Sequence, residues 1–202
     1  MRPWKAFAAV SVLAAVALLG IGAPGADAGD TLVVKRFLLG HLDPNTGAFI
    51  ALGGRGAEEV RRDSVILLVF TAPVDPESVG ARTIRIGVPS TPGLIVPAKG
   101  SFHMQTVSAF DPVSSTFLQK RAYRNRVLFD PLARWDGFLS LQDRQPFDGD
   151  TTYSVTVPGV DQGALKTLKS TKGTPVARTF TTTFRTSDEE FTDLFCPGMD
   201  DD

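Results

Sequence analysis

The stretch "VILLVFTAPVDPESV", from Val65 to Val79, begins as an unbroken apolar run and ends in a turn that contains two prolines. Six consecutive apolar residues that are followed by turn residues are typical of a buried strand. Because successive side chains of a strand point to opposite faces, Ile66, Leu68 and Phe70 lie on one face. The sequence predicts that this face lies in the core, between two sheets.

The segment "VDPESV" is interpreted as the end of that strand. Pro73 has no backbone N–H for strand pairing, and Asp75 before Pro76 favours a turn because an Asp side chain accepts a hydrogen bond from the backbone two residues on. A calcium site that uses Asp75 and Glu77 is the alternative. Ca²⁺ takes six to eight oxygen ligands, whereas only two carboxylates stand here, so the turn is favoured.

The opposite face of the same strand is also apolar, since it carries Val65, Leu67 and Val69. A solvated face would normally be polar. Either the segment from Ser90 to Arg126 folds over this face, or another protein covers it. The first interpretation is favoured, because a bare apolar patch is a liability for a soluble monomer.

The rest of the chain has the pattern of a β protein. Short β-branched and aromatic runs alternate with Gly, Pro, Asp and Asn clusters, and no window of about 12 residues keeps a helical apolar stripe. Strands are predicted within residues 30–39, 63–70, 82–88, 93–98, 101–110, 125–131, 151–160 and 177–186, with a short extended piece within 45–60. This pattern predicts an all-β fold, an antiparallel β-sandwich of about seven or eight strands in two sheets.

Four of these runs together resemble a known family. They are "DSVILLVFTAPVDPESVGARTIRI", "RVLFDPLA", "GDTTYSVTVPGV" and "ARTFTTTFRT". In this order they are similar to the bacterial Ig-like domain of the SbsA type, a module of S-layer and other surface proteins, which has a "pVdpxSv" turn, an "F-x-P" strand end, a "gttYtvtv" strand and a closing "tF-x-T" strand. The likeness covers about residues 63–186, with an insertion at about 90–126.

The resemblance implies an exported, Ig-like module that is usually one building block of a larger surface or secreted protein and has no catalytic residues. The chain departs from the family after "VTVPGV", where the family often has "D-x-x-G-N" and this chain has "DQGALKTLKSTKG". That departure weakens any inference of a metal or polar site in this loop.

The first 28 residues have the three parts of a secretory signal peptide. Arg2 and Lys5 precede an apolar stretch from Ala6 to Ile21, and an A-x-A cleavage pattern ends at Ala28. An uncleaved membrane anchor is the alternative, but the apolar stretch is shorter than the roughly 20 residues that span a bilayer. We therefore expect cleavage after Ala28 and an exported protein, located in the periplasm, at the cell surface or outside the cell, without a membrane span after cleavage.

Residues 29–186 are predicted to form one domain, and residues 187–202 form an acidic tail. The expected mature chain has 19 basic and 21 acidic side chains, a balance that gives no electrostatic argument for nucleic acid or for an anionic membrane. The tail carries seven acids and no base, with Phe191, Leu194 and Phe195 spaced for one face of a short helix. It docks on the domain, leads to a partner, or is disordered.

Cys196 in this tail is the only cysteine, so no disulfide within the chain is available to stabilise the fold. An exposed free thiol is the favoured interpretation, and a bridge to another molecule is the alternative.

Residues with other candidate chemistry are few. His103 beside Met104 pairs an imidazole with a thioether, as some copper carriers do, but adjacent strand residues point to opposite faces. Neither of the two histidines stands in a nucleophile motif such as G-x-S-x-G, and no pair of carboxylates is nominated for glycoside hydrolysis. We therefore assign no catalytic, cofactor-binding or metal-binding residue and expect a protein that is not an enzyme.

The segment "QKRAYRNR" places Lys120, Arg121, Arg124 and Arg126 around Tyr123. These residues offer a grip for an anionic wall polymer or phosphate, with Tyr123 stacking on a sugar. The alternative is a solvated, charged loop without a ligand.

These observations predict a non-enzymatic exported module with a structural or adhesive role at the cell surface or in the periplasm. Cell-wall polysaccharide and other surface proteins are the expected partners. A small exported binding protein for a carbohydrate or a metal is the alternative function.

Overall fold

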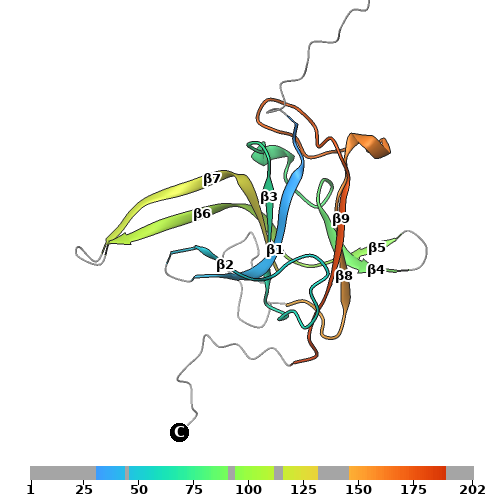
Figure 1. The fold of residues 1–202 in the computed structure, drawn as a ribbon, viewed down its shortest axis with the longest axis horizontal. Helices are drawn as coiled ribbons and strands as arrows, with labels where there is room; N and C mark the ends of the chain where they lie inside the picture. The colour runs from blue at the N-terminus through green and yellow to red at the C-terminus, as the bar shows by residue number, and fades with distance from the viewer. Residues whose placement is uncertain (1–30, 44–45, 91–93, 112–115, 132–145, 190–202) are drawn as a thin grey trace, which may run out of the picture.

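The computed structural model describes residues 31–43, 46–90, 94–111, 116–131 and 146–189, which form two antiparallel sheets (Figure 1). The larger sheet consists, in spatial order, of β2 (Phe49–Gly53), β1 (Val34–Leu42), β3 (Val65–Phe70), β7 (Thr116–Asp130) and β6 (Ser101–Asp111). The smaller sheet consists of β5 (Ile95–Pro97), β4 (Arg85–Pro89), β8 (Thr152–Val157) and β9 (Phe180–Arg185). Helix in the described residues is limited to two short 3₁₀ turns, Pro76–Ser78 and Val160–Gln162. The predicted all-β sandwich is confirmed.

The strand register of the larger sheet sorts its side chains into inward and outward rows, because each strand alternates its faces. One inward row consists of Phe37, Leu68, Val127 and Met104. The next row, which faces outward, consists of Leu38, Leu67, Leu128 and His103. The alternation predicted for β3 is therefore confirmed, and both of its faces are apolar.

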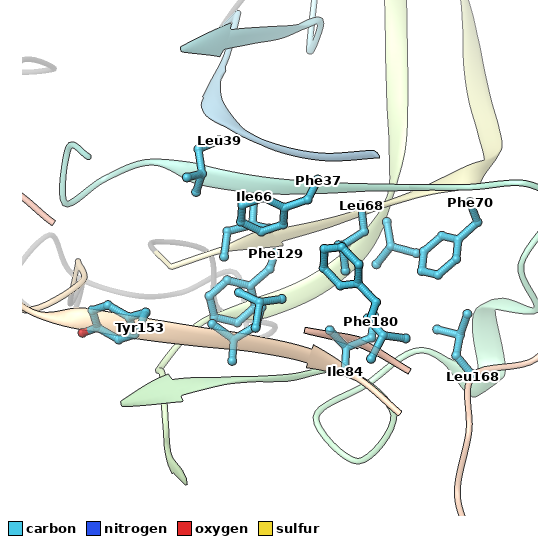
Figure 2. Close-up of a cluster of buried hydrophobic side chains, with 14 of the residues drawn as sticks. Phe37, Leu39, Ile66, Leu68, Phe70, Ile84, Phe129, Tyr153, Leu168 and Phe180 are labelled. Atoms are coloured by element: carbon cyan, nitrogen blue, oxygen red, sulfur yellow. The ribbon is translucent and has the colours of Figure 1, made fainter. Parts of the chain in front are cut away.

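The main core lies between the two sheets. Figure 2 shows Ile66 and Leu68 of β3 pointing toward the layer that holds Ile84 and Phe180. Phe70 is fully buried in this core, as the sequence predicted. At one end of the core lies a cluster of three aromatic rings whose centroids are 4.7–5.4 Å apart, formed by Phe147, Tyr153 and Phe184.

The "VDPESV" segment ends β3 as a capped turn. A carboxylate oxygen of Asp75 accepts a hydrogen bond of 3.1 Å from the backbone N–H of Glu77, the contact expected of an Asp at a turn. The Ser78 hydroxyl donates to the backbone carbonyl of Asp75 over 2.7 Å. The Asp75 side chain thus caps the short 3₁₀ turn that starts at Pro76, and the turn interpretation is confirmed.

The outward apolar face of β3 belongs to a second, smaller core. Val65, Leu67 and Leu128 are buried there, and Leu42 and Phe49 of the β1–β2 hairpin pack against them. The turn of that hairpin reaches the free edge of β6, where the backbone N–H of Ser108 donates to the Thr46 carbonyl over 2.8 Å. The larger sheet therefore curls around its own outer face.

The sequence analysis favoured the segment from Ser90 to Arg126 as the cover of the outer face of β3, and the structure contradicts this. This segment forms β5, β6 and most of β7, which extend the two sheets at their edges by strand pairing. The hairpin of β1 and β2 lies against the outer face instead. The cover therefore comes from residues that precede β3 in the chain.

Candidate functional site: a basic groove on the larger sheet

The candidate functional site lies where the β6–β7 hairpin leaves the rest of the larger sheet (Figure 1). Between the pairs Met104–Val127 and Thr106–Ala122, β6 contributes one residue and β7 contributes four, the run from Tyr123 to Arg126. Such an excess of residues on one strand is a bulge, and bulges bend strands and redirect their side chains.

Two hydrogen bonds attach this bulge to the end of β3 and to the segment that follows it. The Asn125 side-chain amide donates to the Phe70 carbonyl over 3.1 Å, and the Val74 N–H donates to the Arg124 carbonyl over 2.7 Å. The charged segment "QKRAYRNR" therefore lies in strand β7 rather than in a loop, while Arg121 and Arg124 remain exposed to solvent. The side chain of Lys120 lies outside the described residues.

The bulge places two guanidinium groups over the ring of Tyr123. The Arg126 guanidinium carbon lies 3.9 Å from the ring centroid, and that of Arg121 lies 5.3 Å away, both within the range of a cation–π contact. Arg126 also donates through Nη1 to the Oε1 of Gln105 over 3.0 Å. Gln105 is only 1% exposed, so the Arg126 side chain is held between a ring and a buried amide.

This geometry changes the role expected for Tyr123. The ring face beneath Arg126 is occupied by the guanidinium and does not offer a stacking surface for a sugar. Tyr123 instead positions Arg126. The anion-binding role expected of the arginines is compatible with this arrangement, because a fixed guanidinium still presents several N–H donors.

A groove of about 500 Å³ runs beside the bulge, on the outer face of the larger sheet. Its floor is apolar and is formed by Leu38, Phe49, Leu67 and Val69. Its basic side chains are Lys35, Arg36 and Arg126, and no acid is found among the described residues that line it. The groove therefore combines an apolar floor with a positive end.

The strand register explains why these three cations meet. Arg36 pairs with Val69, and Val69 pairs with Arg126, so the two arginines flank one valine across three strands. A register shift between Val34 and Arg36 places Lys35 in an irregularity of β1. Two strand irregularities, one in β1 and one in β7, thus bring basic side chains to the same end of the groove.

Lys35 and Arg36 were not nominated by the sequence analysis. The signal that could have found them is the interruption of the apolar run "TLVVKRFLL" by two adjacent basic residues. Their proximity to Arg126 follows from the pairing of both β1 and β7 with β3, which places Arg36 and Arg126, 90 positions apart in the chain, on either side of Val69. That pairing has no local signature.

His103 and Met104 do not form a joint ligand pair. Met104 packs against the main core, whereas His103 pairs with Leu128 in the outward row. Burial lowers the pKa of His103, and the negative charge of Asp130 opposes this shift. The two side chains point to opposite faces, as predicted for adjacent strand residues.

Metal ligands do not converge in the part of the chain that the structure describes. No group of three or more His, Cys, Asp or Glu side chains there is arranged to hold a metal ion. Asp75, nominated by the calcium alternative, uses its carboxylate as a turn cap.

A second concavity, of about 420 Å³, lies between β5 and the start of β8. The Tyr153 hydroxyl accepts a hydrogen bond of 2.8 Å from the Asp148 N–H and donates to the Asp148 carboxylate over 3.3 Å. Burial is the main cause that raises the pKa of Tyr153. Arg62 donates to the Phe147 carbonyl over 2.8 Å. These polar groups are engaged in holding residues 146–151 against the sandwich.

Several sequence predictions lie outside the described residues. They are the signal peptide of residues 1–28, the part of the acidic tail that follows Glu189, and Cys196 within that part. Among the residues that the structure does describe, no helix has the length and apolar character needed to cross a bilayer.

Comparisons with protein-family models, with curated proteins and with solved structures found no match to this chain. Functional inference therefore depends on the groove itself and on the residues that form it.

Proposed function

We propose that this protein is a non-enzymatic, exported module with an Ig-like fold of the SbsA type and an adhesive role at the cell surface or in the periplasm. Residues 1–28 direct its export, and the groove on the larger sheet binds an anionic polymer. The polymer is a polysaccharide that carries carboxylate or phosphate groups. The order of the four family-like runs along the chain supports the assignment of the module.

The observation that carries the binding role is the convergence of Lys35, Arg36 and Arg126 at one end of the groove. Arginine guanidinium groups bind carboxylate and phosphate through two parallel hydrogen bonds, and these charge-assisted bonds are stronger than neutral ones. Gln105 and Tyr123 hold Arg126 in place before any ligand arrives. Such preorganisation lowers the entropy lost on binding.

The floor of the groove supports a polymer of sugars over a small inorganic anion. Leu38, Phe49, Leu67 and Val69 extend the site beyond the positive end. The apolar faces of sugar rings lie on such surfaces while their charged substituents reach the cations. Since the net charge of the expected mature chain is slightly negative, attraction is local to the groove and decreases with salt.

The test is titration of the mature chain, residues 29–202, with a polyuronate and a phosphorylated glucan, and with the neutral glucan as reference. Calorimetry is expected to give binding to both polyanions and none to the glucan. Arg126→Gln is expected to weaken binding about tenfold, since a hydrogen bond to a charged group contributes about 1.5–3 kcal/mol and 1.4 kcal/mol corresponds to tenfold.

The control is Arg85→Gln, which removes an exposed arginine from β4 of the smaller sheet, outside the groove. This variant is expected to bind the polyanions as the unmodified chain does. Equal losses in Arg126→Gln and Arg85→Gln would show nonspecific attraction to the whole surface and would contradict the proposed site. Thermal unfolding of each variant separates lost binding from lost fold.

A further inference from the structure

The concavity of about 420 Å³ between β5 and the start of β8 has an apolar side and a charged side. The apolar side consists of Val88, Val96, Pro97, Ala98 and Pro146. Val96 is 56% exposed there. Exposed apolar surface inside a concavity of this size, together with a few polar groups, is typical of a site for a small molecule.

The charged side carries Arg62 and Asp148, and Lys99 also lines the cavity. Arg62 donates through Nε to the carbonyl of Phe147, the residue directly before Asp148. Burial raises the pKa of Tyr153, the negative charge of Asp148 adds to that rise, and the positive charge of Arg62 opposes it. Two opposite charges therefore lie close to the same phenol. Figure 2 shows the Tyr153 hydroxyl on the side of the ring that faces away from the core.

The contacts that hold residues 146–151 against the sandwich use only part of these polar groups. Arg62 uses Nε, whereas the N–H donors on its two Nη atoms have no hydrogen bond to a described residue. The Asp148 carboxylate accepts one long hydrogen bond, of 3.3 Å, from the Tyr153 hydroxyl. Within the part of the chain that the structure describes, no ion pair joins Arg62 to Asp148. Both charges thus keep hydrogen-bonding capacity for a ligand.

The Arg62 side chain is held in place before a ligand arrives. Its backbone carbonyl accepts a hydrogen bond of 2.9 Å from the Phe147 N–H, and its Nε donates to the Phe147 carbonyl over 2.8 Å. A fixed guanidinium is suited to a carboxylate, because two parallel charge-assisted hydrogen bonds form between them. The Asp148 carboxylate is in turn suited to an ammonium group.

We propose that this concavity binds a free α-amino acid with an apolar side chain. Its carboxylate pairs with Arg62, its ammonium group pairs with Asp148, and its side chain covers Val96. An α-amino acid carries both charges on one carbon atom, so it requires opposite charges that lie close together but do not neutralise each other. The site is independent of the proposed polymer binding, since it shares no lining residue with the groove on the larger sheet.

The test is a titration of the ¹⁵N-labelled mature chain with L-leucine and with three analogues that each lack one part of it. They are 4-methylpentanoate, which lacks the ammonium group, 3-methylbutylamine, which lacks the carboxylate, and glycine, which lacks the apolar side chain. L-Leucine is expected to shift the amide signals of Val96, Ala98 and Asp148 saturably and to leave Val69 in the groove unchanged. Each analogue that lacks a charge is expected to bind about tenfold more weakly, because a hydrogen-bonded charge pair is lost.

Asp148→Asn tests the ammonium partner. This variant removes the negative charge and keeps a side-chain oxygen that accepts from the Tyr153 hydroxyl. Its preference for L-leucine over 4-methylpentanoate is expected to disappear. A preference that persists in Asp148→Asn, or 4-methylpentanoate that binds the unmodified chain as tightly as L-leucine does, would overturn the proposal.

Val96→Ser tests the apolar side without a buried substitution. Binding of L-leucine is expected to weaken about fourfold for each methyl group of Val96 that the ligand covers. Leu94→Ser is the matched control, since Leu94 is 69% exposed and lies outside the lining. Equal losses in the two variants would overturn the proposal, and so would a folded, unmodified chain that does not bind L-leucine. Either result leaves polymer binding in the groove to its own test.

Discussion

Replacing Phe70 by alanine tests the arrangement on which the fold depends. Phe70 ends β3 on its inward face and is fully buried between the two sheets. Truncating a buried phenylalanine removes its transfer free energy and leaves a cavity, which together cost about 3–5 kcal/mol. For a domain of this size, 1 kcal/mol shifts the melting temperature by about 2–4 °C, so a fall of about 6–20 °C is expected.

The matched controls are neighbours with different environments. Val69→Ala, on the half-buried outward face of the same strand, is expected to cost about 1 kcal/mol, since each fully buried methyl contributes about 0.8 kcal/mol. Asp75→Ala removes one exposed turn hydrogen bond and is expected to cost about 0.5–1.5 kcal/mol.

Urea denaturation of the three variants, followed by circular dichroism, gives the free energies of unfolding. Phe70→Ala is expected to lower the free energy of unfolding much more than Val69→Ala or Asp75→Ala does. A neutral Phe70→Ala would refute the strand phase and the core built on it. An Asp75→Ala loss as large as that of Phe70→Ala would show that the "VDPESV" segment does more than end a strand.

Three further predictions concern export, metals and pH. Expressed with its signal in a bacterial host, the protein is expected outside the cytoplasm with Gly29 as its first residue, and N-terminal sequencing that finds Met1 retained would contradict this. Addition of EDTA is expected to leave the melting temperature of the mature chain unchanged, because a metal bound only to the folded state would stabilise it; a fall of several degrees would direct attention to Asp75 and Glu77. Because burial raises the pKa of Tyr153, the folded state favours the neutral phenol over the phenolate. The stability that this preference contributes is fully present below the unfolded-state pKa of about 10, and it is lost as the pH rises through the higher pKa of the folded state. Denaturation at a series of pH values should show a decline above about pH 10 that is smaller in Tyr153→Phe, and an identical decline in both chains would refute this assignment.

The strands and the main core were accessible to sequence reasoning because their signals are local. The two-residue alternation in "TTYSVTVPGV" predicts that Tyr153, Val155 and Val157 share a face, and all three are buried in the main core. In the same way, Asp75 and Pro76 contain the chemistry of their own turn.

The course of β7 was only partly accessible. The sequence predicted a strand over residues 125–131, whereas the strand begins at Thr116. Its first part is rich in Lys and Arg, which are not typical strand residues, and it is held by pairing with β6. The pairing partner lies in another segment and compensates for the weak local preference.

The groove was the least accessible feature, because it depends on register. A bulge moves side chains by one or more positions and is not evident from composition. The same holds for the cover of the outer face, since the contact between Thr46 and Ser108 joins residues that are 62 positions apart. The sequence analysis identified the arginines of β7 as candidate ligand-binding residues, but it did not predict that Arg36 lies beside Arg126.

The most direct test of the central claim is a map of amide chemical-shift changes as a uronate oligosaccharide is added to the ¹⁵N-labelled mature chain. The shifted amides are expected to cluster at Lys35, Arg36, Val69 and Arg126, and the shift changes are expected to diminish with added salt. Shifts that cluster on the smaller sheet, or spread over both sheets without saturation, would contradict a binding site in the groove.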